Sequence, residues 1–289
     1  MSKKDLMSSE VISRKEKAIN IIVFLLLSIG AISMVFPFFY MIMTSFMTKN
    51  QYLSGQLTVI PDPWVFGKYA EVLKKGNFIS GILNTIKVEI PVLTIGGFTS
   101  ALAAFAFAKM NFRGKNGIFM LLLATIMIPF AVIMIPQYVM FTKMHWTDSL
   151  LPLIIPACFG NISMIFFLRQ NLTSIPNDLM DAAKLDGCGY FRTFWQIFLP
   201  LMKGAVGTQL TLWFMGIWND FLGPLIYLDS ESNYTVQLAL RLLNSMGEAT
   251  SEYPMIMAGA VISCIPLLIL FICFQRYFMD SMVVSGIKG

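Results

Sequence analysis

The chain has 289 residues, of which 56% are hydrophobic and only 13% are charged, and its formal net charge is +5. Soluble domains carry charge on about a quarter of their residues, so this composition predicts an integral membrane protein. The positive charge does not indicate nucleic-acid binding, because the Lys and Arg residues flank the apolar runs instead of gathering on one soluble element. Repeated apolar runs longer than about 18 residues favour one multi-span bundle over two soluble domains.

Six apolar runs follow one another and predict an all-α polytopic fold with six transmembrane helices. The predicted spans are 19–43, 86–108, 118–141, 150–168, 204–228 and 255–274. The chain then divides into an N-terminal tail (1–18), a six-helix transmembrane domain (19–278) and a C-terminal tail (279–289). A long polar loop, residues 171–200, interrupts the transmembrane domain.

The distribution of basic residues predicts the orientation of these helices. With both termini inside, about two-thirds of the 21 Lys and Arg residues lie on the same side as the 171–200 loop, as the positive-inside rule requires. Both termini and this loop are therefore expected in the cytoplasm. Segments 44–80 and 229–253 are expected outside the cell as loops.

One face of the second apolar run carries a small residue at every fourth position, namely Gly96, Ser100, Ala104 and Ala108. Small side chains let two helices approach closely in lipid, so this face is a predicted packing seam. Glu89 lies in the same run. We expect it at the outer membrane interface, where a carboxylate does not by itself indicate a function.

The first half of the 171–200 loop has the pattern of a short helix. Pro176 presets the backbone for a first helical turn, and Asp178 places negative charge at the positive end of the helix dipole. Gly187 lies where a left-handed residue ends a helix.

The second half of the loop predicts another short helix, residues 190–198, which Pro200 should end. Its large aromatic residues recur at helical spacing and should form one face. They are Phe191, Phe194, Trp195 and Phe198. A hairpin this small cannot bury such a face alone, so the face needs a partner or the membrane interface.

No set of residues predicts covalent chemistry. The chain has no Gly-x-x-x-x-Gly-Lys-Ser/Thr phosphate loop, and it has no Ser/His/Asp set or carboxylate pair in a plausible cavity. The four cysteines have no Cys-x-x-Cys spacing, and the single histidine, His145, has no ligand set around it. We therefore expect a non-catalytic subunit without a metal or cofactor of its own, which depends on a partner for energy.

Polar and aromatic residues inside the predicted spans are candidates for a translocation path. Each polar residue alone is better explained as a hydrogen bond between helices, although together they could line a wet cavity. The aromatic residues could stack on a sugar or belong to an interfacial belt, and the belt is the simpler interpretation. The candidates are Asn161, Ser163, Gln209, Thr211, Phe214, Trp218 and Asn219.

The residue spacing in the 171–200 loop resembles the "EAA" loop of permease subunits in ATP-binding-cassette (ABC) importers. That family has Glu-Ala-Ala, three residues, Gly, nine residues, Ile, one residue and Leu-Pro, and the spacing here is the same, with Asp in place of Glu. The resemblance implies that this loop is the coupling helix that docks in a cleft of an ATPase subunit. The coupling residues it implies are Asp181, Ala182, Ala183, Asp186, Gly187, Ile197, Leu199 and Pro200.

Other stretches, such as Trp-Asn-Asp-Phe at 218–221, resemble the carbohydrate-uptake branch of these permeases, in particular MalG-type maltose permease subunits. The resemblance implies a type I (MetI-like) importer fold in the plasma membrane of a bacterium or archaeon. It also implies a second permease subunit, an ABC ATPase dimer that binds ATP and magnesium, an extracytoplasmic solute-binding protein and a carbohydrate substrate. The chain is also expected to contact membrane lipid, and it is not expected to bind nucleic acid.

Two alternatives stay open at this stage. The solute could be a polyol, glycerol phosphate or another compound, because the residues of the predicted path do not specify a ligand. The chain could also be a membrane assembly or signalling subunit without transport activity, whose basic inner loop binds some other partner. Co-purification with an ATPase separates transport from this last interpretation.

Overall fold

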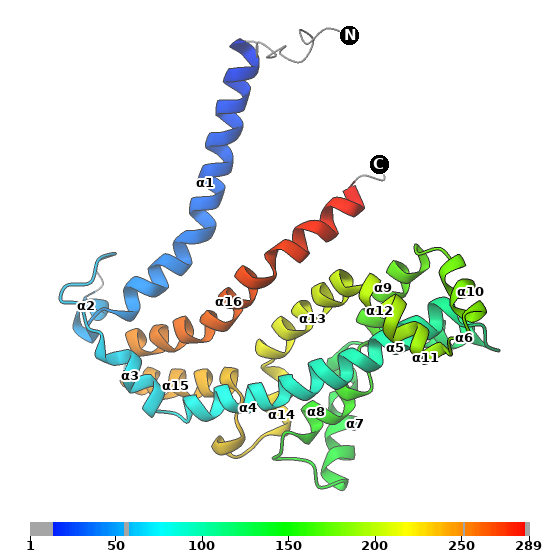
Figure 1. Cartoon of the computed structure of the whole chain (residues 1–289). Helices are drawn as coiled ribbons and strands as arrows, with labels where there is room; N and C mark the ends of the chain where they lie inside the picture. The colour runs from blue at the N-terminus through cyan, green and yellow to red at the C-terminus, as the bar shows by residue number, and fades with distance from the viewer. Residues whose placement is uncertain (1–13, 55–57, 251, 287–289) are drawn as a thin grey trace.

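The computed structural model describes residues 14–54, 58–250 and 252–286, and the regular secondary structure in them is entirely helical (Figure 1). Most of the predicted N-terminal tail and the last three residues of the C-terminal tail lie outside these ranges. The long helices α1 (Arg14–Ser45) and α16 (Tyr253–Gly286) pack against each other and diverge towards the two chain ends (Figure 1).

Shorter helices fill the chain between these two, and two of them, η1 and η2, are π-helical turns inside longer helical runs. Their bounds are α2 (Lys49–Leu53), α3 (Gly67–Lys74), α4 (Phe78–Pro91), η1 (Val92–Gly96), α5 (Gly97–Lys109), α6 (Lys115–Ile126), α7 (Phe130–Lys143), α8 (Leu151–Cys158), α9 (Ile162–Thr173), α10 (Asp178–Leu185), α11 (Tyr190–Thr193), η2 (Phe194–Phe198), α12 (Leu199–Leu201), α13 (Lys203–Trp218), α14 (Leu222–Tyr227), the 3-10 turn η3 (Glu231–Asn233) and α15 (Val236–Thr250).

Four helical runs in the described part of the chain are long and apolar enough to cross a membrane. They are Ile19–Ser45, Phe78–Lys109, Leu151–Thr173 and Tyr253–Gln275. The predicted third span is a pair, α6 and α7, bent by 97°, and it adds a fifth span if the pair is counted as one. The predicted span 204–228 breaks after Trp218, so six spans are not confirmed. A hydropathy profile depends on composition and does not detect a break in the backbone. It therefore overestimates the number of continuous helices.

Segment 229–253 is not the loop that its polar composition predicted, because it contains α15. Val236, Ala239 and Leu243 recur at helical spacing and are fully buried, in one core cluster with Phe78 of α4. The polar residues between them lie on the other face of an amphipathic helix.

The predicted packing seam is confirmed at three of its four positions. Gly96, Ser100 and Ala104 are buried, Ala108 is half-buried, and α5 packs along α9. A Cβ atom at Gly96 would lie 2.5 Å from the carbonyl oxygen of Ala157, so only glycine allows α8 to approach this closely. The seam therefore fixes the position of the α8–α9 break, on which the candidate site depends.

Glu89 is buried between helices, whereas its depth in the membrane stays a prediction. Only 3% of its surface is exposed, and its Oε1 has no hydrogen-bond partner within the described residues. The helix begins at Phe78, eight residues before the predicted start of the span, which adds about 12 Å of helix beyond the expected end. Glu89 is consequently enclosed where α4 packs against α8, α13 and α15.

Candidate functional site

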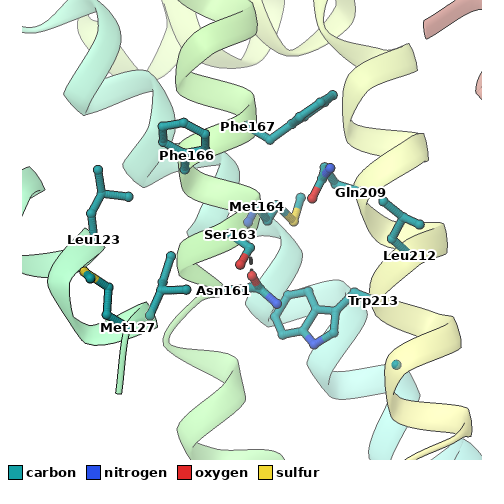
Figure 2. Close-up of a pocket in the computed structure, with 12 residues that line it drawn as sticks. Leu123, Met127, Asn161, Ser163, Met164, Phe166, Phe167, Gln209, Leu212 and Trp213 are labelled. Carbon is teal, nitrogen blue, oxygen red and sulfur yellow. Dashed lines mark hydrogen bonds between the residues drawn. The ribbon is translucent and has the colours of Figure 1, made fainter. Parts of the chain in front are cut away.

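A cavity of about 730 Å³ lies between the end of α6, helix α9 and helix α13 (Figure 2). We call it the α9–α13 cavity. Its volume is in the range of small-molecule sites, about 300–1,000 Å³. The walls are mostly apolar, with three polar side chains from Asn161, Ser163 and Gln209, and none of the described residues that line it is charged. Three of the seven predicted path residues therefore meet in one cavity.

Asn161 is held in place at the start of α9. Its backbone N–H donates to Ser100 Oγ (2.8 Å), and its Oδ1 accepts the backbone N–H of Met164 (3.0 Å). The second bond is a helix N-cap, which satisfies a backbone donor that has no partner within the helix. The cap orients the amide, so its NH₂ group is the part left to contact a solute.

Trp213 also lines the cavity, although it was not among the predicted path residues. It lies one helical turn after Gln209 on α13, and residues at this spacing share a helix face. Figure 2 shows its ring next to Asn161, across the cavity from Leu123 and Met127. The spacing of Trp213 from Gln209 could have predicted it as a cavity residue from the sequence.

The other four predicted path residues lie elsewhere. Thr211 is buried and donates to the Gly207 carbonyl oxygen of its own helix (2.8 Å). Trp218 is 2% exposed and stacks on Phe214 with ring centroids 5.8 Å apart, so its ring belongs to the core and not to an interfacial belt. Asn219 donates to a carbonyl oxygen at the end of α13.

The first helix of the 171–200 loop, α10, ends as its sequence predicts. Gly187 has a φ of +73°, which confirms the left-handed residue. Its N–H donates to the Lys184 carbonyl oxygen (3.0 Å), and the N–H of Cys188 donates to that of Ala183 (2.9 Å). These two bonds form a Schellman motif, which closes a helix by satisfying its last carbonyl groups.

Pro200 does not end the second helix. The chain runs from α11 through the π-helical turn η2 into α12, which includes Pro200, and the N–H of Met202 donates to the Phe198 carbonyl oxygen (3.0 Å). A proline inside a standard α-helix clashes with the carbonyl group four residues earlier. The wider π-helical turn directly before Pro200 changes this backbone geometry and lets the helix continue.

The predicted aromatic face of this helix divides into two sides. Phe194 and Phe198 are fully buried against Phe105 of α5, with centroid distances of 5.5 and 5.3 Å. Phe191 and Trp195 are more than half exposed. One side therefore anchors the loop to the bundle, and the other remains available to a partner.

Most of the predicted coupling residues lie on the exposed side of the loop. Asp181, Ala182, Asp186, Gly187 and Pro200 are exposed, Ile197 and Leu199 are half-buried, and Ala183 is buried. Leu185, between them, is 90% exposed.

One cation ties this loop to the end of α5. Lys109 Nζ donates to the Ile175 carbonyl oxygen (2.6 Å) and to Asn177 Oδ1 (2.8 Å), directly before α10 begins. The same ammonium group lies 5.5 Å from the ring centroid of Phe198, near the end of the loop. Lys109 thus contacts both the entry and the exit of the 171–200 loop.

Comparison with known proteins adds a family and a fold. A family model described as "binding-protein-dependent transport system inner membrane component" matches residues 96–284. The arabinooligosaccharides transport system permease protein AraQ of Halalkalibacterium halodurans is 33% identical over 279 residues, which cover 91% of this chain and 96% of AraQ. The sn-glycerol-3-phosphate transport system permease protein UgpE of Yersinia pestis is 26% identical over 276 residues, covering 93% and 98%.

A solved structure agrees with these relatives in fold. It is a chain of a bacterial ABC transporter involved in the import of the acidic polysaccharide alginate, and it superposes with a TM-score of 0.82 at 23% identity. The superposition covers 92% of this chain and 98% of the other. The break in α13–α14 and the bent α6–α7 pair thus occur within a known permease fold.

Proposed function

Because the chain belongs to the family of binding-protein-dependent transport system inner membrane components, we propose that it is the membrane-spanning permease subunit of an ABC importer for a carbohydrate. A second, related permease subunit would complete the pore. A dimer of ABC ATPase subunits would bind ATP and magnesium, and an extracytoplasmic binding protein would deliver the solute. This chain would be non-catalytic and would convert movement of the ATPase dimer into movement of its helices.

The anchored 171–200 loop is the observation that carries the proposal. A coupling element must transmit force, so it has to be rigid on one side and exposed on the other. Phe194, Phe198 and the Lys109 contacts supply the rigid side. The exposed side, around Leu185 and Gly187, is the surface we assign to the ATPase. If all six apolar runs cross the membrane, this assignment puts the loop and both chain termini in the cytoplasm.

The lining of the α9–α13 cavity favours a neutral solute with many hydroxyl groups. An amide, a hydroxyl group and an indole ring are groups that hydrogen-bond or stack with sugars. Glycerol phosphate, which the name of UgpE suggests, carries a charge that proteins normally pair with Arg or Lys. No described residue that lines the cavity is cationic, so we favour a saccharide, and the name of AraQ suggests arabino-oligosaccharides as first probes.

Transport by the reconstituted importer tests this assignment. The four-part complex with its binding protein is placed in proteoliposomes, and ATP-dependent uptake of labelled arabinotriose and of glycerol 3-phosphate is compared. We expect uptake of the saccharide, and we expect Gln209→Leu to lower it by up to about tenfold, since a lost hydrogen bond to a bound solute costs about 1.4 kcal/mol or less. The matched control is Gln275→Leu, at an exposed position outside the cavity.

Three results would contradict the proposal. Uptake of glycerol 3-phosphate without uptake of any saccharide would change the substrate class. An assembly that hydrolyses ATP but moves neither solute, or a chain that recruits no ATPase, would favour the assembly or signalling role.

A further inference from the structure

Three chain segments break close to one another in the part of the bundle that contains the cavity. The α6–α7 pair is interrupted at residues 127–129, α8 and α9 at 159–161, and α13 and α14 at 219–221. Residues in or just before each break line the α9–α13 cavity, because Met127 and Asn161 lie within their breaks and Gly216 lies shortly before the third. The breaks therefore lie along one wall of that cavity.

A second cavity, of about 270 Å³, lies on the other side of the same three breaks. Phe130 and Ala157, which line it, lie within two residues of their breaks, and Asp220 lies in the third break itself. We call it the α7–α14 cavity. Helix breaks that meet inside a membrane protein expose backbone and polar groups away from lipid, which is the arrangement that solute sites in transporters use.

The polar lining of the α7–α14 cavity consists of Asp220, Gln137 and Tyr227. The Tyr227 hydroxyl donates to Gln137 Oε1 (3.1 Å), which leaves the tyrosine oxygen as an acceptor and the Gln137 NH₂ group as a donor. Asp220 is held by the Gly223 N–H, which donates to its Oδ1 (3.2 Å). A Cβ atom at Gly223 would lie 2.7 Å from Asp220 Oδ2, so glycine makes room for the carboxylate.

These groups match the chemistry of a sugar and not that of an anion. Among the described residues Asp220 takes part in no salt bridge, and a carboxylate repels a phosphate or a carboxylate solute. It accepts hydrogen bonds from hydroxyl groups, and the neighbouring donor and acceptor of Gln137 and Tyr227 suit a second hydroxyl. The rings of Phe130 and Phe141 supply the apolar wall on which a sugar ring can pack.

We propose that the α7–α14 cavity is a second saccharide subsite, separated from the α9–α13 cavity by the three helix breaks. Asp220, Gln137 and Tyr227 bind the hydroxyl groups of one sugar unit, while the α9–α13 cavity holds the next. This inference rests on the proposed function. It adds that the pore in this subunit binds a chain of at least two sugar units.

Uptake by the complete reconstituted importer provides the first test, with arabinotriose as the probe. Asp220→Asn keeps an oxygen for the Gly223 N–H but removes the charge, and Tyr227→Phe removes only a hydroxyl group. We expect each to lower the uptake rate about tenfold at unchanged membrane assembly. Tyr138→Phe is the matched control for Tyr227→Phe, because Tyr138 is an exposed residue of α7 that does not line the cavity. It should retain the parent rate.

Protection from a small thiol reagent locates the sugar directly. Leu153→Cys places a thiol in the α7–α14 cavity, and Leu212→Cys places one in the α9–α13 cavity. Labelling of each engineered cysteine is followed by mass spectrometry in importer that still takes up arabinotriose. We expect the sugar to slow labelling at both positions severalfold, and we expect Asp220→Asn to remove the protection at position 153 only.

The outcomes separate the two proposals. Protection at position 212 but not at 153, or wild-type uptake by Asp220→Asn and Tyr227→Phe, overturns the second subsite and leaves the carbohydrate importer in place. Failure of the parent complex to import or bind any saccharide overturns both.

Discussion

At the scale of single residues, Asp148 joins two loops that are distant in sequence. It lies in the turn between α7 and α8, with a φ of +55°. Its carboxylate accepts the backbone N–H groups of Asp229 (3.1 Å) and Ser230 (2.8 Å) and the hydroxyl group of Ser230. The side chain of Asn233 donates to its carbonyl oxygen (2.6 Å). The turn and the segment after α14 are therefore held together by one acid.

These bonds predict a dependence of stability on pH. The hydrogen bond from the Ser230 side chain, followed by that from its backbone, lowers the pKa of Asp148 to about 2, below the value of about 3.9 for an unfolded aspartate. The stabilisation is complete above about pH 4 and is lost as the pH falls towards 2. Asp148→Asn should be less stable than the parent at pH 7, and the difference in thermal unfolding temperature in detergent should shrink below pH 4.

A neighbouring substitution controls for the change of charge in that prediction. Asp229→Asn alters an exposed carboxylate in the same segment, where only the backbone N–H contacts Asp148. A difference between Asp148→Asn and the parent that stays constant from pH 7 to pH 2.5 would contradict the role given to the Asp148 carboxylate.

Gly187 is the residue on which the geometry of the 171–200 loop, and with it the proposed coupling role, depends. Its φ of +73° is strained for any residue with a Cβ atom, by about 1–2 kcal/mol, although a Cβ atom there would meet nothing within 4 Å. Gly187→Val should therefore abolish solute uptake while the protein stays at its normal level in the membrane. Gly189→Val is the matched control, since Gly189 has an ordinary φ of −72° and equally open surroundings. Equal uptake by the two variants would refute the coupling role.

At the scale of elements, α5 and the 171–200 loop form one mechanical unit. The buried rings of Phe194 and Phe198 pack on α5, and Lys109 bonds the segment before α10. Arg169 of α9 donates to the Phe107 carbonyl oxygen (3.2 Å), so α9 is joined to the end of α5 as well. Movement of the loop must consequently move both helices, and α9 carries the wall of the α9–α13 cavity.

Loss of the Lys109 contacts should uncouple the loop from the pore. Lys109→Met keeps the length of the side chain but removes the charge and its donors. We expect severalfold slower uptake and more ATP hydrolysed per solute imported, with partial recovery in Lys109→Arg. The control is Lys203→Met, an exposed lysine next to the same loop. An unchanged ratio of ATP hydrolysed to solute imported in Lys109→Met would contradict this positioning role.

Local signals predicted local structure at this scale. The small-residue seam of α5 and the glycine turn of the loop follow from spacing along one helix or one turn, and both are found. The prediction that Pro200 ends the helix was wrong, because the effect of this proline depends on the π-helical turn before it. No local sequence pattern predicts that turn. Helix α15 was missed because its polar residues outweighed three buried apolar positions at helical spacing.

Across the whole molecule, the sequence predicted the helical membrane fold, whereas its six spans stay a prediction. The interruptions at 127–129, 159–161 and 219–221 leave hydropathy unchanged, so the six apolar runs include only four helices, or five with the bent pair, that are long and apolar enough to cross a membrane in the described chain. The cavity was predictable only in part for the same reason. Asn161 and Gln209 come together through the packing of α5, α9 and α13, whereas Trp218, with an equally promising side chain, turns into the core.

Co-purification shows whether this chain couples an ATPase to solute import. The tagged chain is solubilised from native membranes in mild detergent, captured, and examined for ATPase activity and for bound proteins by mass spectrometry. We predict an ABC ATPase and a second permease subunit in the captured complex, and loss of the ATPase alone in Gly187→Val. Capture of the chain by itself, or with proteins that do not bind ATP, would contradict the coupling role.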